Sequence, residues 1–140
     1  MRIDKDWSDV FFKGIGTIIT LNDEIEIERN FRPAPGFEET ADIGLVSAIE
    51  VEIDGDGVGP ITVFGHIYAP NDDNNEIEDG VTFFGSFVGS SLEIEGDDNK
   101  DGTLTRLFYK RPNGIIPGLS YLSNNLIVQA KKGGWLEQLN

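Results

Sequence analysis

Residues 96–102, with the sequence GDDNKDG, carry oxygen-bearing side chains at alternate positions, which is the arrangement that calcium loops use. Asp97, Asn99 and Asp101 occupy positions 1, 3 and 5 of the calcium-loop pattern, and Gly102 follows where such a loop turns sharply. A calcium ion takes roughly six to eight oxygen ligands, and acidic side chains in a tight loop supply them. The spacing therefore predicts a divalent-cation site, with calcium as the cofactor.

The calcium-loop pattern is incomplete within this segment. Its twelfth position requires a bidentate Glu, and Phe108 stands there instead. Further ligands must come from other loops, and we expect Asp54 and Asp56 of the IDGDG segment, or else Asp72 and Asp73 of the PNDDNN segment, to supply them. In a competing interpretation, Asp101 and Gly102 form the two-residue tip of a β-hairpin, because Asp-Gly favours the type I′ turn.

Three segments place only glutamates on their polar side: EIEIE (24–28), SAIEVEI (47–53) and SLEIE (91–95). Strict alternation of apolar and polar residues predicts half-buried strands. Like charges directly opposite each other on neighbouring strands are destabilising. These strands are therefore not neighbours, or a positive charge lies between them.

The glutamate segments are a second candidate site, for a basic protein rather than a metal ion. The predicted partner-binding residues are Glu50, Glu52, Glu93 and Glu95. Bases later in the chain, Arg106 and Lys110, are expected to neutralise the last two of these glutamates. The alternative is that the glutamates form a solvated outer face with no partner.

The net charge of −14 is concentrated in the middle of the chain. Residues 33–99 contain 16 acids and no Lys or Arg. Such a field repels phosphate, which argues against nucleic acid and anionic membranes as partners, and it attracts cations and basic surfaces. Solubility alone is the competing explanation of the charge.

The sequence contains no recognisable catalytic motif, so we expect no enzyme. Cysteine is absent, which excludes thiol nucleophiles, disulfides and thiolate metal sites. His66 is the only histidine, and we expect a structural role for it, with Ser86 as a hydrogen-bonding partner. Catalysis would require a pocket that gathers His66, a carboxylate and a hydroxyl, and the spacing indicates none.

The pattern of the whole chain predicts one all-β domain over residues 1–140. Period-two segments alternate with turn-forming clusters such as RPAPG, DGDGVGP and RPNG, and no segment has a convincing helical stripe. Further strands are expected at residues 9–21, 60–69, 80–88, 103–110 and 124–130. The predicted fold is a single antiparallel β-sandwich, Greek-key or jelly-roll-like, and the alternative is a small β-barrel.

One internal echo stands out within these strands. ITVFGHIY (61–68) and VTFFGSFV (81–88) match in character at almost every position. Because the echo occurs only once, we interpret it as two neighbouring strands rather than a solenoid. Gly65 and Gly85 lie inside them, where a glycine marks a bulge, a bend or a close backbone approach.

The sequence favours a non-catalytic binding module whose acidic surface meets a divalent cation or a basic protein. One alternative is an immunity or inhibitor protein that masks a basic partner, and another is a structural subunit of a virion or filament. We expect a soluble, cytoplasmic protein because the charged N-terminus has no signal-peptide core, with an extracellular location as the alternative. Homo-oligomers are compatible with the mildly basic, apolar C-terminal third.

Overall fold

A computed structural model of the chain describes residues 1–70, 74–96, 104–114 and 116–117. These residues form twelve strands and no helix: β1 (Arg2–Ile3), β2 (Val10–Phe12), β3 (Ile15–Thr20), β4 (Ile25–Ile27), β5 (Phe31–Pro33), β6 (Asp42–Ser47), β7 (Val51–Asp54), β8 (Ile61–Ala69), β9 (Glu76–Glu78), β10 (Val81–Gly89), β11 (Glu93–Ile94) and β12 (Arg106–Tyr109). The all-β class predicted from the sequence is confirmed.

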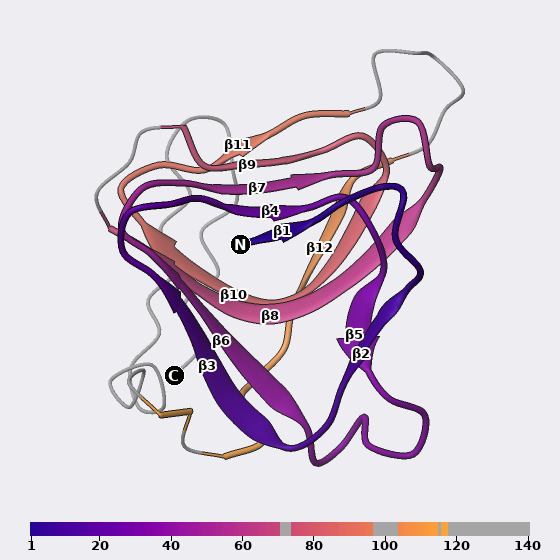
Figure 1. The fold of residues 1–140 in the computed structure, drawn as a ribbon, viewed down its shortest axis with the longest axis vertical. Coiled ribbons are helices and arrows are strands. Elements are labelled where there is room, and N and C mark those ends of the chain that lie inside the picture. Colours follow the sequence, from indigo (N-terminus) through magenta and orange to yellow (C-terminus); the bar gives the residue numbers. More distant parts are fainter. Residues whose placement is uncertain (71–73, 97–103, 115, 118–140) are drawn as a thin grey trace.

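The strands wind into a β-solenoid of about four turns, and every strand pair is parallel. Sheet A has the order β1-β4-β7-β9-β11, and sheet B contains the path β12-β10-β8-β5-β2, with β3 beside β6 and β6 beside β8. Figure 1 shows sheet A as one side of the coil and the long strands β8 and β10 as another. The predicted antiparallel sandwich and the alternative barrel are therefore both wrong.

The wrong prediction of strand direction has a physical cause. Alternating side chains have a period of two in parallel and antiparallel strands alike, so the pattern does not reveal strand direction. Parallel neighbours need a long crossover connection. Here the strands of the other sheet form that crossover, so no helix appears in the described residues.

The echo segments are hydrogen-bonded neighbours, as predicted, but they are neighbours within a solenoid. β8 and β10 pair in register along their whole length, so that Gly65 lies beside Gly85 and His66 beside Ser86. The first half of β8 contacts β5 and its second half contacts β6. Gly65 lies between the part of β8 that pairs with β5 and the part that pairs with β6, and Gly85 lies against its backbone, where a glycine allows a close approach.

The core consists of inward columns, in which equivalent residues of successive turns stack on one another. Ile3, Ile27, Ile53 and Ile77 form one such column and are at most 4% exposed. Burying one isoleucine side chain contributes about 1.5–3 kcal/mol. Each turn therefore depends on its neighbours for a hydrophobic core, as in other repeat folds.

The outer face of sheet B is partly covered by the chain that follows β12. Ile116 is 2% exposed and packs against Val46, Tyr68 and Val88. Thr17 Oγ1 donates a hydrogen bond to the carbonyl oxygen of Pro117. Residues 110–114 and 116–117 thus lie along the outer side of the coil and explain why β8 is apolar on both faces.

Candidate functional site

The candidate site is a set of acidic side chains on the outer side of sheet A. A motif of a charged residue, an isoleucine and an acid recurs in all five strands of this sheet, beginning with Arg2-Ile3-Asp4 and ending with Glu93-Ile94-Glu95. In β4, β7 and β9 the isoleucine points into the core, and alternation then directs both flanking side chains outward. We call the outward set the acidic face: Glu26, Glu28, Glu52, Asp54, Glu76, Glu78 and Glu93.

The register stacks these acids in columns. Glu26 lies beside Glu52, Glu52 beside Glu76, and Glu76 beside Glu93. Asp54 pairs with Glu78 in the next column. Parallel strands lie about 4.8 Å apart, so Glu52 and Glu76 each have a like charge above and below them at that spacing. Of the three predicted glutamate strands, β4 and β7 are neighbours, whereas β9 separates β11 from β7.

A positive charge occupies the first turn of the acidic face. Arg2 begins the column, directly beside Glu26. Its Nη2 atom lies 3.2 Å from Glu26 Oε1 and 3.3 Å from Glu28 Oε2, so one guanidinium bridges two carboxylates. Both glutamates are buried beneath it. A guanidinium therefore fits between two outward acids of one strand.

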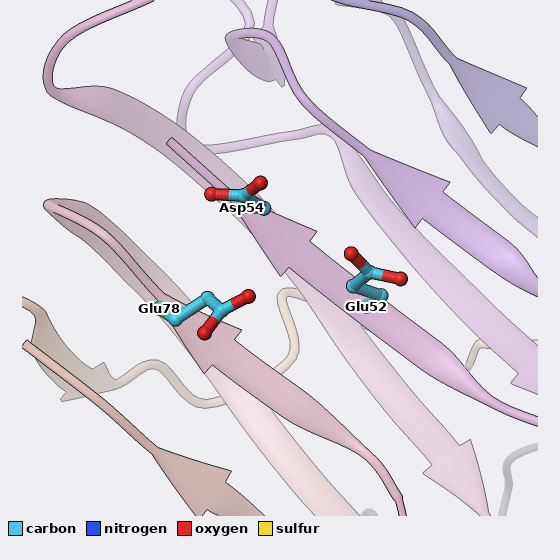
Figure 2. A group of neighbouring side chains, drawn as sticks. All are labelled: Glu52, Asp54 and Glu78. Carbon is cyan, nitrogen blue, oxygen red and sulfur yellow. The ribbon is translucent and has the colours of Figure 1, made fainter. Parts of the chain in front are cut away.

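The next two turns bring three carboxylates together. Oxygen atoms of Glu52, Asp54 and Glu78 all lie within 4.8 Å of one another. Figure 2 shows Glu52 and Asp54 on β7 and Glu78 on the adjacent β9. Three half-buried carboxylates at this distance can bind one divalent cation or one multivalent cationic group.

The crowding changes the ionisation of this group. Burial, followed by the charges of Asp54, Glu76, Asp79 and Glu52, raises the pKa of Glu78 to about 7. Burial also raises the pKa of Glu52, and among the neighbouring charges that of Glu26 raises it most. The site therefore favours any ligand that supplies positive charge, a proton included.

The raised pKa of Glu78 predicts that stability falls as the pH rises. Between about pH 4.5 and 7 the native state keeps a proton on Glu78 that the unfolded chain has released, so unfolding becomes easier with increasing pH. We expect the melting temperature to fall across this window. Glu78→Gln should flatten the profile and raise the melting temperature by a few degrees above pH 7, as measured by circular dichroism.

The control for this experiment is Glu39→Gln, which removes the same charge from an exposed loop. It should leave the slope between pH 4.5 and 7 as in the wild type. An equal flattening by both variants would show that net charge, rather than the crowding around Glu78, governs the profile.

Among the predicted metal ligands, the structure describes Asp54 and Asp56. Asp97, Asn99 and Asp101 lie outside the described residues, as do the predicted strand at 124–130 and the hairpin tip. Asp54 does join a carboxylate group, but with Glu52 and Glu78. Asp56 is not a member of this group, and its backbone N–H donates to Asp54 Oδ1 at 2.6 Å.

Two of the predicted partner-binding residues, Glu52 and Glu93, lie in one column of the acidic face. Glu50 precedes β7 and Glu95 follows β11, at the ends of their strands. The expected neutralising bases lie elsewhere. Arg106 belongs to β12 in sheet B, beside Thr82, and Lys110 contacts Asp42.

Sequence reasoning placed Glu26 and Glu28 in a glutamate segment without naming them as partner-binding residues, and it missed Glu76 and Glu78. EIE at 76–78 lies between the strands predicted at 60–69 and 80–88, and because no strand was predicted there, one turn of the repeat was not counted. The signal that could have found these residues is the recurrence of the charged residue–Ile–acid motif at positions 2–4, 26–28, 52–54, 76–78 and 93–95.

A second polar group lies on the outer face of sheet B. Ser86 Oγ and His66 Nδ1 are 2.8 Å apart, and His66 Nε2 lies 3.4 Å from Asp42 Oδ1. With Asp42 as the acceptor, Nε2 carries the proton and Nδ1 accepts from the serine hydroxyl. Spacing alone did not indicate this gathering of a histidine, a carboxylate and a hydroxyl. All three are at least 95% buried, so no substrate reaches Ser86 Oγ in this conformation.

This buried group fastens the segment that follows β12. Lys110 Nζ lies 3.0 Å from Asp42 Oδ1, and the backbone N–H of Asn113 donates to Asp42 Oδ2. Burial raises the pKa of Asp42, but hydrogen bonds from His66, Asn113 and Lys110 outweigh it, so the pKa lies below its ordinary value. Asp42 is therefore an ionised anchor.

No protein-family model, curated protein or solved structure matches this chain. Within the described ranges, no helix has the length and apolar character needed to span a bilayer. Inference about function therefore depends on the chemistry of the acidic face.

Proposed function

We propose that this protein is a non-catalytic binding module whose acidic face holds cationic side chains of a basic partner protein. The observation that supports this function is the contact of Arg2 with Glu26 and Glu28. A guanidinium of the chain itself already occupies the first turn, and it indicates the chemistry that the following turns would accept. Masking of a basic protein, as an immunity or inhibitor protein does, belongs to this proposal.

Among the described residues, no Lys or Arg occupies the following turns in this way. In the part of the chain that the structure describes, Glu52, Asp54, Glu76 and Glu78 form no ion pair with Lys or Arg. Their mutual repulsion is relieved when a partner brings positive charge. Arginines presented by the partner at a spacing of about 4.8 Å, as on its own strand ladder, would match successive turns.

A second candidate function is the binding of a divalent cation by Glu52, Asp54 and Glu78. It is favoured by the mutual distance of their oxygens, all within 4.8 Å. Carboxylate oxygens are the ligands that calcium prefers. This cation site is distinct from the one expected at residues 96–102 and shares Asp54 with that expectation.

One titration series distinguishes the two functions. An oligo-arginine peptide and calcium chloride are titrated separately into the protein by calorimetry at low ionic strength. We expect the peptide to bind with an affinity that the double variant Glu52→Gln/Glu78→Gln lowers by at least about tenfold, because each partner guanidinium loses a charge-assisted contact. The melting temperature of this variant should not fall, since it removes like-charge repulsion.

The matched control is Glu38→Gln/Glu39→Gln, which removes the same charge from an exposed loop. Its affinity for the peptide should stay within about twofold of the wild type, because screening limits the influence of distant charges. Equal losses in both variants would contradict a specific acidic face. Calcium binding that disappears only in the face variant, with weak peptide binding, would favour the cation site instead.

A further inference from the structure

The two ends of the solenoid expose strands that have a hydrogen-bonded neighbour on one side only. In the described residues, sheet A begins at β1 and ends at β11, while sheet B ends at β12 and begins at β2 and β3. Every pair inside the coil is parallel, so each end presents a parallel edge. Such edges are templates for pairing with another chain.

Apolar side chains accompany these edges. At the C-terminal end Ile94 is 51% and Phe108 47% exposed, although both continue columns that run through the coil. At the N-terminal end Phe11 of β2 is 46% exposed. Large exposed apolar residues grouped at an edge indicate a contact surface, and terminal repeats of a solenoid are ordinarily capped.

The register defines what would fit on the C-terminal end. Leu107 continues the inward column formed by Val10, Phe31, Val63 and Phe83. If β2 of a second copy followed β12 in the same register, its Val10 would lie on Leu107. In this register, Phe11 of the second copy would lie beside Phe108 and Asp9 of the second copy would lie beside Arg106.

A second copy that is stacked in this way also places its β1 beside β11. Ile94 continues the isoleucine column, so Ile3 of the second copy would lie on it, and Arg2 would lie beside Glu93. Both sheets are thereby extended at once, because β1 and β2 belong to one turn as β11 and β12 do. The two charged positions, Arg106 with Asp9 and Glu93 with Arg2, bring opposite charges together.

We infer that the occupant of the C-terminal end is the N-terminal end of a second copy of this chain, in a head-to-tail stack. A tail-to-tail contact would instead place β11 against β11 and Glu93 against Glu93, which is unfavourable. A heterologous contact of this kind leaves one free end of each type, so the stack grows without closing. This inference does not depend on the function proposed for the acidic face.

Sedimentation velocity over a range of protein concentrations tests the stack. The wild type should show a sedimentation coefficient that rises continuously with concentration. Arg106→Glu on the tail, or Asp9→Arg on the head, should raise the concentration needed for half-assembly by at least about tenfold, because each sets like charges opposite each other. Mixing the two variants should restore assembly, since the altered head and tail are complementary.

Asp9 also accepts a hydrogen bond from Asn30 Nδ2 at 3.0 Å, so its variant needs a check of folding by circular dichroism. Arg106 is exposed and provides the independent variant. The control Glu39→Arg changes charge on the side of the coil and should assemble as the wild type does. A monomer at all concentrations, a closed dimer, or unchanged assembly of Arg106→Glu would overturn the inference. Slow amide exchange at β12 in a monomeric protein would also overturn the inference, because it would show that another part of the same chain covers the edge of sheet B.

Discussion

Replacing Gly85 by alanine is expected to lower the free energy of unfolding by about 3 kcal/mol. A Cβ atom at this position would overlap the carbonyl oxygen of Gly65 and would lie 2.8 Å from its carbonyl carbon. These are backbone atoms of the adjacent strand, so no side chain can rotate away, and β8 and β10 must separate locally. Overpacking of a well-ordered core costs about 1–3 kcal/mol, and a backbone clash belongs at the upper end.

The measurement is urea unfolding followed by circular dichroism, with Gly16→Ala as the matched control. Gly16 also lies within a strand, but a Cβ there would meet only Ile43 Cδ1, at 3.8 Å, which is ordinary contact. The control should be neutral or slightly stabilising, because alanine reduces the freedom of the unfolded chain. Equal stability of Gly85→Ala and wild type would contradict the close approach of the two strands.

Replacing Asp42 by alanine is expected to cost about 2–4 kcal/mol and to release the segment that crosses sheet B. Asp42 is 3% exposed and accepts hydrogen bonds from Lys110 Nζ and from the backbone N–H of Asn113. Removing one partner of a buried pair leaves the others desolvated and unpaired. Trypsin cleavage after Lys110, followed by mass spectrometry, should become faster while the solenoid itself stays folded.

A control variant and the pH dependence of stability both bear on the anchoring role of Asp42. Ser86→Ala should cost only about 1 kcal/mol and leave cleavage after Lys110 unchanged, because the serine bonds to His66 and not to the segment. The stabilisation that Asp42 provides is complete above its ordinary pKa of 3.8 and is lost as the pH falls through the lower value of the native state. The wild type should therefore approach Asp42→Ala in stability only below about pH 3.8. Unchanged cleavage in Asp42→Ala would contradict the anchoring role.

Most strand positions were accessible from the sequence. The alternation around Ile27 and Ile53, and the apolar runs that became β8, β10 and β12, predicted strands that the structure confirms. The strands β1, β5, β6 and β9 were not predicted. Pro33 suggested a connector, and EIE at 76–78 is too short to stand out, so both depend on pairing with neighbouring turns.

The sequence likewise predicted that the site is acidic, but it did not predict which acids lie together. Glu52 and Asp54 were singled out separately, the first for a protein partner and the second for a metal. The register of β7 against β9 places Asp54 beside Glu78, and the side-chain positions bring an oxygen of Glu52 within 4.8 Å of both. Carboxylates 24 residues apart meet because one turn of the coil returns the chain to the same side.

The sequence by itself determined the all-β class, the inward face of most strands and the strong acidity of the middle of the chain. These properties follow from local alternation and from composition, which need no knowledge of distant contacts. The tertiary structure decided the strand direction, the stacking of acids in columns and the gathering of Asp42, His66 and Ser86. Each of these depends on which segments become neighbours, because the period of two is shared by every kind of sheet.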